Sequence, residues 1–454
     1  MTAERFNVNN QSLTGGLMKK KFIVASVLAV ALALAGCSSS SDKTSASSES
    51  TVSDAPVTLT LWHNLGDTQN GVAVKALTEA YTALHPNVTF NLVSQPADNY
   101  FALLQAAAVS KTGPDLALMW CCLFIHKSYL ANLKGLVPDE ALARMGGLEW
   151  TADNFDIANG PNIMLTDRQF YMGFYNKEAF TKAGVTSVPK TWDELYAACG
   201  KLKSSGYTPM VYGNGGQSLG ALYYPWYDSS YITIGQASST GFRDLYSGKD
   251  QWDSPSNVAA YEKYAALKTK GCTNSDILTK TNNMDDFLGG KAAMIIDGTW
   301  DTQKFTDKFG DKVGAFVPPF SDAPMTGVVQ MAGQGISIMK YSKNITAAAG
   351  FVTFMTTDEA SAIFDKAGLI PNVIGSTTSN PVNKEMLAFT ETGGLTAFPM
   401  LDNVIQGDVV DAGNKIIPSI LAGKIKPAAA LKQLRQVWEQ IAADAKTETY
   451  KLPD

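Results

Sequence analysis

The first strongly patterned stretch of the chain alternates apolar and polar residues from Val57 to Trp62, which reads VTLTLW. Alternation with β-branched residues predicts a β-strand. The next stretch, GVAVKALTEAYTALHP, spaces its apolar residues as an amphipathic helix does and ends at Pro86, and NVTFNLVSQ after it again predicts a strand. A strand, a helix and a strand in this order predict a βαβ unit and hence a parallel sheet.

Strand and helix patterns keep alternating through the rest of the chain. YFALLQAAAVSK and TWDELYAACGKLKSSG predict helices, and in the second Thr191 and Glu194 have the spacing of a capping box. PDLALMW, KAAMIIDG and GQGISIMK predict strands. Near the C-terminus, Leu431, Leu434 and Trp438 share one face of an amphipathic helix. The sequence therefore predicts an α/β fold, and its folded part of about 400 residues is long enough for two lobes.

The N-terminal region 1–36 has the pattern of a secretory signal. Lysines at 19–21 precede an apolar run from Phe22 to Ala35, which is shorter than the roughly 20 residues of a membrane span. Leu34-Ala35-Gly36-Cys37 resembles a bacterial lipobox, in which the mature chain begins at the cysteine and carries a lipid on its sulfur. An ordinary signal with a chance cysteine is the alternative. Met18 is the expected start of the chain.

Residues 37–54 are rich in Ser, Thr and Asp and have few apolar residues to bury, so they predict a lipidated, flexible stalk. The expected location is the extracellular face of a bacterial cytoplasmic membrane, with the lipid on Cys37 as the anchor. The chain has 37 Lys and Arg against 42 Asp and Glu, a net charge of −5. Because no basic stripe appears, nucleic acid is not an expected partner.

The cysteines and histidines point to no particular chemistry. Cys121 and Cys122 follow an apolar run and are expected to be buried thiols. Cys199 and Cys272 could pair in an extracellular setting, but their spacing alone leaves this open. None of the 3 histidines stands at metal-ligand spacing from a second ligand. We therefore expect no metal and no cofactor.

Three separated segments resemble one family. Residues 173–195 (GFYNKEAFTKAGVTSVPKTWDEL), 287–300 (FLGGKAAMIIDGTW) and 358–373 (DEASAIFDKAGLIPNV) are similar to blocks of the extracellular solute-binding proteins of ABC importers, carbohydrate-binding family 1. The resemblance covers about Val57 to Ala443. It implies an α/β, two-lobed, periplasmic-binding-protein-like fold of the class II type, with hinge crossings between the lobes and a ligand cleft between them.

The lobe boundaries follow from the resemblance alone. It implies an N-terminal lobe of residues 55–168 plus 333–358 and a C-terminal lobe of residues 172–328 plus 372–454. The segment before the first matching block lacks the family's usual pattern. No ligand residue is therefore carried over from the family to that segment, and this includes Gln169.

A sugar site needs a flat aromatic face and fixed polar groups around it. The resemblance places a stacking tryptophan at Trp300 and a cleft aromatic at Trp120, with a core position as the alternative for each. Asp297 could accept a hydrogen bond from a sugar hydroxyl or be a solvated loop carboxylate. Where the family crosses between lobes, MAGQG supplies Gly333 and Gln334, and either close backbone approach to a ligand or hinge freedom explains the glycines.

Two further segments supply candidate ligand residues. The first loop offers Asn64, His63 and Asp67, whose side chains suit hydroxyl groups as donors or acceptors, with a self-satisfied turn as the alternative. The segment ALYYPWYDSS gathers aromatic residues, and Trp226 and Tyr227 are its favoured cleft candidates. The alternative for this segment is a helix packed into the second lobe.

Together these features predict a membrane-tethered, monomeric binding protein that captures a sugar, expected to be an oligosaccharide, by hinge closure and delivers it to ABC permease subunits. No G-x-S-x-G, H-E-x-x-H or Walker pattern indicates an enzyme. An extracellular glycoside hydrolase would need two carboxylates, such as Asp297 with Asp67 or Asp228, and is the less favoured alternative. A polyamine or peptide ligand, and a sensing or adhesion role, remain open.

Overall fold

The structure, a computed structural model, describes residues 55–66, 68–96, 99–120, 128–153, 156–215, 220–230, 242–331, 333–403 and 405–446. All described residues belong to one compact unit of the chain. The predicted signal region, Cys37 and the stalk lie outside the described residues, as do Cys121 and Cys122.

The first sheet has five strands in the order β2-β1-β3-β10-β4. They are β1 (Val57–His63), β2 (Val88–Ser94), β3 (Leu116–Trp120), β4 (Met164–Leu165) and β10 (Gln334–Ile338). β1 pairs in parallel with β2 and β3, which confirms the predicted βαβ unit. β10 is antiparallel to β3 and β4, so the sheet is mixed and the prediction of a parallel sheet was only partly right. A segment far along the chain returns to this sheet, which no local pattern could indicate.

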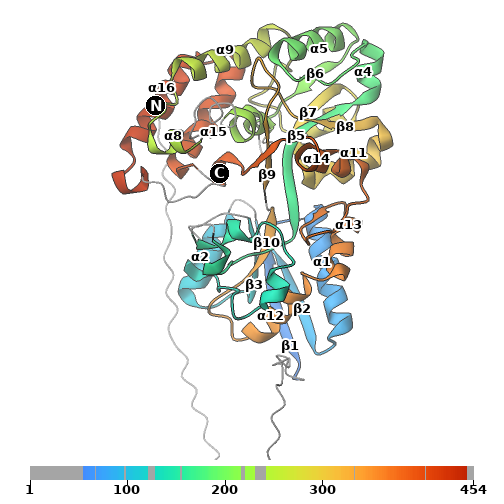
Figure 1. Cartoon of the computed structure of the whole chain (residues 1–454), viewed down its shortest axis with the longest axis vertical. Helices are drawn as coiled ribbons and strands as arrows, with labels where there is room; N and C mark the ends of the chain where they lie inside the picture. Colours follow the sequence, from blue (N-terminus) through green and yellow to red (C-terminus); the bar gives the residue numbers. More distant parts are fainter. Residues whose placement is uncertain are drawn as a thin grey trace, which may run out of the picture. The chain divides into compact units, whose positions relative to one another are not determined.

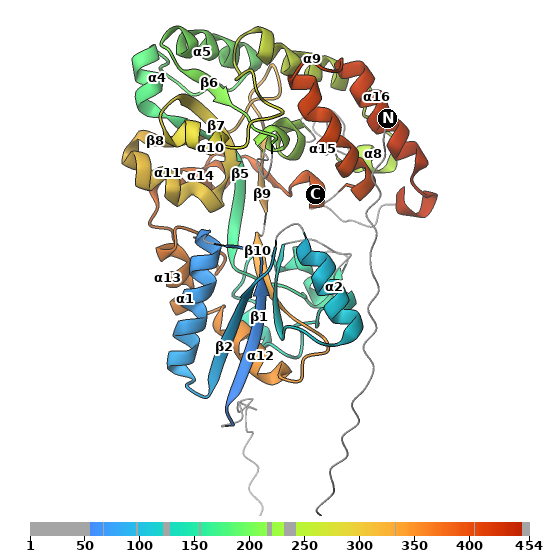
Figure 2. The same cartoon turned by 180° about the vertical axis from the view of Figure 1, so that it is seen from behind.

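Helices pack on both sides of this sheet, and Figure 2 shows α1 and α2 on either side of β1 and β2. The helices of this region are α1 (Gln69–Leu84), α2 (Tyr100–Ser110), α3 (Asp139–Leu142), α12 (Ile345–Phe354) and α13 (Asp358–Lys366). Leu59 and Leu61 of β1 are fully buried and lie in one core with Leu77 of α1 and Leu104 of α2. Short 3-10 turns follow at Leu148–Thr151 and Ile157–Asn159.

The second sheet has seven strands in the order β12-β9-β5-β7-β6, with β8 and β11 also paired to β5. They are β5 (Asp167–Asn176), β6 (Thr208–Val211), β7 (Ala292–Gly298), β8 (Val313–Phe316), β9 (Gly327–Met331), β11 (Ile370–Pro371) and β12 (Thr396–Phe398). The long strand β5 is antiparallel to β7, β8, β9 and β11. Its central position means that most of this sheet is organised around one strand.

Ten helices of the described chain accompany the second sheet. They are α4 (Lys177–Ala183), α5 (Trp192–Ser204), α6 (Gly220–Leu222), α8 (Phe242–Ser247), α9 (Pro255–Thr269), α10 (Asn283–Leu288), α11 (Thr302–Phe309), α14 (Pro381–Glu391), α15 (Gly407–Leu421) and α16 (Pro427–Gln440). α9, α15 and α16 pack against one another (Figure 1). Leu431 and Leu434 of α16 are fully buried, as the amphipathic pattern predicts, and the partly buried Trp438 donates its indole N–H to the Tyr246 carbonyl at 3.1 Å.

Helix α5 begins where the sequence predicts it. The Thr191 hydroxyl accepts a hydrogen bond from the Glu194 backbone N–H at 3.3 Å, and the Glu194 carboxylate accepts one from the Lys190 N–H at 2.7 Å. Side-chain oxygens thus satisfy backbone donors that a helix start leaves without partners. On the same helix, Cys199 forms a disulfide with Cys272, with the Cα atoms 5.0 Å apart. The pairing that spacing alone left open is therefore present in the structure.

In the part of the chain that the structure describes, three crossings connect the two sheets. β4 ends at Leu165 and β5 begins at Asp167, while β9 ends at Met331 and β10 begins at Gln334. The Thr166 N–H donates to the Gln334 carbonyl at 2.7 Å, so these two crossings lie side by side. β11 supplies the third crossing by pairing with the first residues of β5. Figures 1 and 2 show β5 reaching from the second sheet toward β10.

Asp167 is a buried carboxyl at these crossings. It accepts hydrogen bonds from the Thr166 hydroxyl at 2.7 Å and the Gln169 amide at 3.1 Å. Burial nevertheless raises the pKa of Asp167 from its usual 3.8 to about 6. Between these two pH values the folded chain holds a proton that the unfolded chain has lost. The carboxyl therefore stabilises the fold below about pH 4, and this contribution is lost as the pH rises to about 6.

We expect Asp167→Asn to remove this pH dependence. The difference between the two pKa values corresponds to on the order of 3 kcal/mol of unfolding free energy. The variant should therefore gain stability relative to the natural chain as the pH rises from 4 to 6. Urea unfolding of both proteins across this range measures the difference. Glu140→Gln, at an exposed carboxylate, serves as the control. If the difference in unfolding free energy between Asp167→Asn and the natural protein does not change with pH, the Asp167 carboxyl ionises normally in the fold.

Candidate functional site

A cavity of about 380 Å³ lies where the two sheets approach each other. This volume falls in the range of small-molecule sites, which is roughly 300–1,000 Å³. The residues that line it are Asn64, Leu65, Thr68, Asn70, Trp120, Gln169, Tyr171, Tyr223, Tyr227, Trp300, Gly333, Gln334, Met400 and Asp402. Several of them follow the carboxyl ends of β1 and β3, where open α/β sheets hold ligands.

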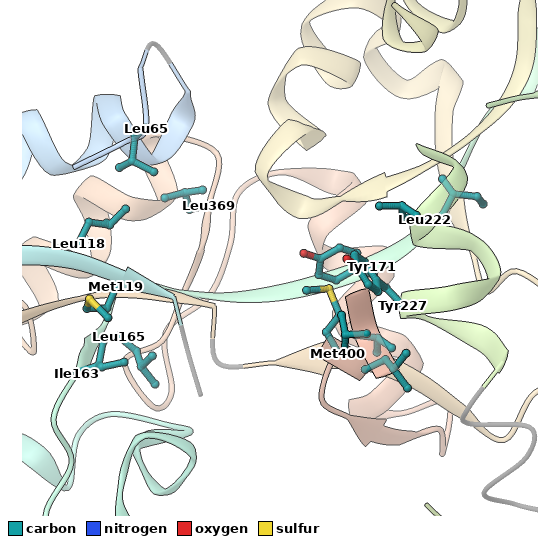
Figure 3. Close-up of a cluster of buried hydrophobic side chains, with 14 of the residues drawn as sticks. Leu65, Leu118, Met119, Ile163, Leu165, Tyr171, Leu222, Tyr227, Leu369 and Met400 are labelled. Atoms are coloured by element: carbon teal, nitrogen blue, oxygen red, sulfur yellow. The ribbon is translucent and has the colours of Figure 1, made fainter. Parts of the chain in front are cut away.

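Four aromatic rings form the wall of the cavity on the side of the second sheet. Tyr171 of β5 packs edge-on to Trp300, with ring centroids 4.6 Å apart, and to Tyr223 at 5.2 Å. Tyr223 in turn lies 5.9 Å from Trp300 and 6.3 Å from Tyr227. Figure 3 shows Tyr171 and Tyr227 converging beside Met400. Because the rings stand at steep angles to one another, the wall presents both faces and edges to the cavity.

Trp300 is held in place by the end of β7. Its indole N–H donates to the Asp297 carboxyl, and Asp297 also accepts from the Gly298 N–H at 2.8 Å. A Cβ atom added to Gly298 would stand 1.9 Å from the Trp300 ring, so the ring can lie over the strand only because this residue is glycine. The local sequence Asp-Gly-Thr-Trp therefore positions an aromatic platform at the strand end.

Trp120 provides an aromatic surface on the side of the first sheet. It is the last residue of β3 and is 38% exposed, one of the most exposed large apolar side chains in the described chain. Its ring packs edge-on against Phe101 of α2, with centroids 4.8 Å apart. An exposed tryptophan that lines a cavity is available to a ligand, whereas its buried neighbours in β3 belong to the core.

Amides and a hydroxyl complete the cavity lining. The Asn70 amide donates to the Gln334 side-chain oxygen at 2.7 Å, and Thr68 caps α1 by accepting from the Gly71 N–H at 3.3 Å. At Gly333, φ is +69° and an added Cβ would lie 2.3 Å from the Asp167 carbonyl. Both the backbone conformation and the close approach require glycine at this crossing. The lining thus combines aromatic faces with neutral hydrogen-bonding groups.

Two carboxyl groups lie at or near the cavity. Asp402 lines it, and Asp297 lies buried behind Trp300. Burial, with the charge of Asp301 as a second cause, raises the pKa of Asp297 well above its usual value. Burial also raises the pKa of Tyr223 well above 10, so its hydroxyl is neutral at physiological pH. No Lys, Arg or His is among the described residues that line the cavity.

A side-chain contact also joins the two sides of the cavity. Gln69 is the first residue of α1 and is 8% exposed. With its amide oriented to match its neighbours, Gln69 donates to the Trp300 carbonyl and accepts from the Gln303 N–H at 3.0 Å. Trp300 and Gln303 follow β7 of the second sheet, so Gln69 links elements of both sheets next to the aromatic platform.

Six residues that the sequence analysis proposed lie together around the cavity: Asn64, Trp120, Tyr227, Trp300, Gly333 and Gln334. Asp67 lies outside the described residues. His63 does not line the cavity; its ring nitrogen accepts from the Leu65 N–H at 3.3 Å, and burial lowers its pKa. For His63 the structure thus gives the self-satisfied turn that was the alternative.

The structure places two further candidates outside the cavity lining. Trp226 is fully buried, packs against Trp252 at 5.4 Å and donates to Asn414 at 3.1 Å. Trp226 therefore belongs to the packed interior, which agrees with the alternative of a helix packed into the second lobe. Asp297 is 6% exposed and does not line the cavity, and its carboxyl accepts a hydrogen bond from the Trp300 side chain.

Sequence reasoning missed eight lining residues: Leu65, Thr68, Asn70, Gln169, Tyr171, Tyr223, Met400 and Asp402. Leu65, Thr68 and Asn70 come directly after Asn64, in the first loop and at the start of the next helix. Their closeness to Asn64 in the sequence could have indicated them. Tyr223 stood in the aromatic cluster, but nothing in the sequence distinguished it from Trp226. Met400 and Asp402 come from a segment without a recognisable motif and reach the cavity only through the fold.

Other features of the described chain are less suited to a ligand of this kind. A second hollow, of about 410 Å³, is lined by residues of the second sheet region that include Glu178, Lys308 and Lys312, and by none of the predicted site residues. Among the described residues, no three His, Cys, Asp or Glu side chains gather in a way that could hold a metal ion. No helix in the described part is long and apolar enough to span a bilayer.

Comparison with known proteins adds a family and a fold. A family model described as bacterial extracellular solute-binding protein matches residues 66–362. A putative binding protein of Brucella abortus (strain 2308) is 24% identical over 386 residues, covering 80% of this chain and 88% of the relative. The sn-glycerol-3-phosphate-binding periplasmic protein UgpB of Escherichia coli (strain K12) is 23% identical over 450 residues, covering 91% and 95%.

Solved structures show the same fold. A chitin oligosaccharide binding protein superposes with a TM-score of 0.71 at 21% identity, covering 86% of this chain and 99% of that one. The GacH receptor of Streptomyces glaucescens, solved alone and with acarbose, gives a TM-score of 0.67 at 21% identity, covering 85% and 99%. The fold predicted from the sequence, that of two-lobed periplasmic binding proteins, is thereby confirmed.

Proposed function

The chain belongs to the bacterial extracellular solute-binding proteins, and we propose that it captures an oligosaccharide in the cavity at Trp300 and Trp120 and delivers it to an ABC permease. The observation that carries this proposal is the lining itself. Aromatic side chains from both sheets face a space of about 380 Å³ whose remaining walls are mostly neutral amides and hydroxyls. Sugar rings offer apolar C–H faces to such rings and hydroxyls to such polar groups.

The solved relatives support a sugar ligand, since one is described as binding chitin oligosaccharide and another was solved with acarbose. The glycerol phosphate of the UgpB relative is a different chemistry. A phosphate is usually bound by Arg or Lys, and neither is among the described residues of the lining. The structure does not favour the glycoside hydrolase alternative, because two of the carboxyl groups considered for it, Asp228 and Asp297, are buried and do not line the cavity.

We assign the first sheet to the N-terminal lobe, 55–168 plus 333–358, and the second to the C-terminal lobe, 172–328 plus 372–454. The adjacent crossings at Thr166 and Gly333 then serve as the hinge. Because a ligand between the lobes contacts both only when they are closed, binding favours the closed form. The protein acts as a monomer whose cargo passes to permease subunits at the membrane.

We also assign Cys37 as the lipidated N-terminus of the mature chain, which holds the protein at the extracellular face of the membrane. The lipobox-like sequence and the serine-rich stalk support this assignment. The intact mass of the protein purified from membranes tests it. The expected mass is that of the chain from Cys37 plus acyl groups, and a chain that begins elsewhere without lipid contradicts it.

Thermal unfolding with a panel of solutes tests the proposed function. The panel contains mono- and oligosaccharides, glycerol 3-phosphate, spermidine and short peptides. A ligand that binds only the folded protein raises the unfolding midpoint by mass action. We expect a rise with one group of oligosaccharides. A rise only with spermidine, a peptide or glycerol 3-phosphate would contradict the sugar assignment and leave the fold unchanged.

We expect Gln69→Ala to weaken oligosaccharide binding about fivefold, because a hydrogen bond of this kind contributes about 1 kcal/mol. The variant removes a contact between elements of the two sheets without removing any lining residue. Calorimetric titration measures the change in Kd. Gln433→Ala, at an exposed position of α16, is the matched control and should leave Kd unchanged. Equal Kd values for both variants would show that the Gln69 link does not contribute to closure.

A further inference from the structure

The chain enters the first sheet at the end that lies opposite the cavity. β1 begins at Val57, whose N–H donates to the Asn87 carbonyl at 2.8 Å, and the chain reaches the cavity at Asn64, after β1 has ended at His63. Figure 2 shows α12 and the start of β1 at the end of this sheet that lies away from β5 and β9. The predicted stalk, residues 37–54, therefore precedes the described chain at the end opposite the cavity.

Three lysines lie at this same end of the sheet, although they are far apart in the sequence. Lys111 follows the last residue of α2, while Lys340 and Lys343 follow β10, and all three side chains are exposed. The Met339 N–H donates to the Asp115 carbonyl at 2.9 Å, so the two segments lie side by side. We call the surface formed by these three lysines the basic corner.

The carboxylate of Asp115 at the basic corner is turned into the fold. Asp115 is half-buried and accepts hydrogen bonds from the Ser342 hydroxyl at 2.6 Å, the Asn344 amide at 3.2 Å and the Thr60 N–H at 3.0 Å. In the part of the chain that the structure describes, no carboxylate forms an ion pair with any of the three lysines. The corner therefore presents positive charge to its surroundings.

An exposed apolar side chain stands beside the basic corner. Val109 lies near the end of α2, two residues before Lys111, and is 82% exposed, more than the other large apolar side chains that the structure describes. Lysines combined with an exposed apolar residue suit the headgroup layer of a bilayer, where charge meets lipid phosphates and the apolar group leaves water. The chemistry of this surface thus matches an anionic lipid surface.

A tether would make a weak contact of this kind sufficient. One lysine near an anionic lipid surface favours binding by roughly fivefold, so three lysines favour it by on the order of 100-fold. A flexible chain as long as the stalk spans roughly 25 Å on average. A lipid on Cys37 keeps the basic corner close to the bilayer, and docking then becomes an intramolecular step.

We propose that the basic corner docks on the anionic lipid surface to which the chain is tethered, with the cavity turned away from the bilayer. This inference rests on the lipid anchor of the proposed function and goes beyond it by assigning an orientation. The lysines contact lipid phosphates, and Val109 enters the headgroup layer. The docked protein presents its cavity to the outside, where solute arrives, and leaves the lipid surface to deliver the sugar to the permease.

Hydrogen–deuterium exchange of the natural protein on vesicles tests the proposal. The protein, purified from membranes, is placed on vesicles of phosphatidylcholine alone and of phosphatidylcholine mixed with phosphatidylglycerol. We expect exchange in peptides covering residues 109–115 and 339–344 to be slower by roughly threefold or more on the anionic vesicles, and this protection to disappear as salt is added. Equal exchange on both kinds of vesicle overturns the proposal.

Lys111→Gln/Lys340→Gln/Lys343→Gln identifies the groups responsible. We expect this variant to show the same exchange on neutral and anionic vesicles, while its unfolding midpoint stays close to that of the natural protein. A difference between the vesicles that persists in this variant contradicts the role of the basic corner. If the variant does not fold, the salt dependence of the natural protein decides, because protection insensitive to salt contradicts a charged contact.

The matched control removes three lysines at another place on the surface. Lys415→Gln/Lys424→Gln/Lys432→Gln changes exposed positions of the α15–α16 region and alters the net charge by the same amount. It should keep the protection on anionic vesicles. Loss of the protection in both variants would assign it to the overall charge of the protein and overturn the role of the corner.

The outcomes separate this inference from the proposed function. A protein that attaches to both kinds of vesicle without protection of the corner overturns the inference alone. A protein that does not attach to neutral vesicles lacks the anchor and overturns both the anchor and the docking, whereas thermal unfolding still tests the capture of a sugar. Protection that appears without vesicles and rises with protein concentration assigns the corner to a contact between two copies and overturns the proposal.

Discussion

Replacing Trp300 with alanine is expected to weaken oligosaccharide binding about 100-fold. The side chain lines the cavity, stands against Tyr171 and is anchored by Asp297. Its removal takes away the stacking surface and leaves space in the wall, and truncation of such a central aromatic residue costs about 2–3 kcal/mol. Calorimetric titration of the natural protein and the variant with the best oligosaccharide measures the loss.

The matched control for this variant is Trp226→Phe. Trp226 is as large an aromatic residue and belongs to a neighbouring segment, but it is fully buried away from the cavity. We expect this variant to lower the unfolding midpoint and to change Kd by less than about twofold. If Trp226→Phe reduces affinity as much as Trp300→Ala does, the assignment of the platform to Trp300 is wrong.

Removing the disulfide is expected to have the largest effect on stability. Cys199 and Cys272 are 73 residues apart, and a crosslink closing a loop of that length stabilises a fold by about 4 kcal/mol in the chain-entropy estimate. The variant Cys199→Ser/Cys272→Ser replaces both cysteines of the bridge, so neither of these two positions keeps an unpaired thiol. Urea unfolding, compared with the natural protein in the presence and absence of reductant, measures the loss.

Ligand affinity should be unaffected in the folded double variant. The bridge joins Cys199 of α5 to Cys272, whose carbonyl accepts a hydrogen bond from the Met210 N–H of β6. Neither cysteine lines the cavity. The reduced natural protein should unfold at the same urea concentration as the double variant. If reductant has no effect on unfolding, the disulfide does not form in the protein.

Local pattern was enough to predict the elements with a clear period. The strand at Val57–Trp62 alternates regularly, and the cap at Thr191 is a signal within four residues. β4 and β11 have two residues each and carry no period. The antiparallel return of β10 to β3 joins segments more than 200 residues apart, and this pairing depends on the whole fold.

The site residues also fall into those that the sequence could indicate and those that only the fold brings to the cavity. Trp300 and Asn64 stand at ends of strands that the sequence predicts, so a family resemblance could place them at the cleft. Within the cluster Tyr-Tyr-Pro-Trp-Tyr, which side chains reach the cavity depends on how the helical turn faces. The sequence analysis favoured Trp226 and Tyr227, and the structure buries Trp226 completely. Asp402 reaches the cavity from the far C-terminal part of the chain, so only the tertiary structure reveals it.

The most direct test of the account is hydrogen–deuterium exchange with and without the oligosaccharide that gives the largest thermal shift. Protection is predicted in peptides containing residues 64–70, 223–227, 298–303 and 400–402, and at the crossing around Gly333. Peptides around Lys308 and Lys312, at the second hollow, should be unchanged. Protection confined to that hollow, with none at Trp300, would contradict the claim that the cavity between the sheets captures the sugar.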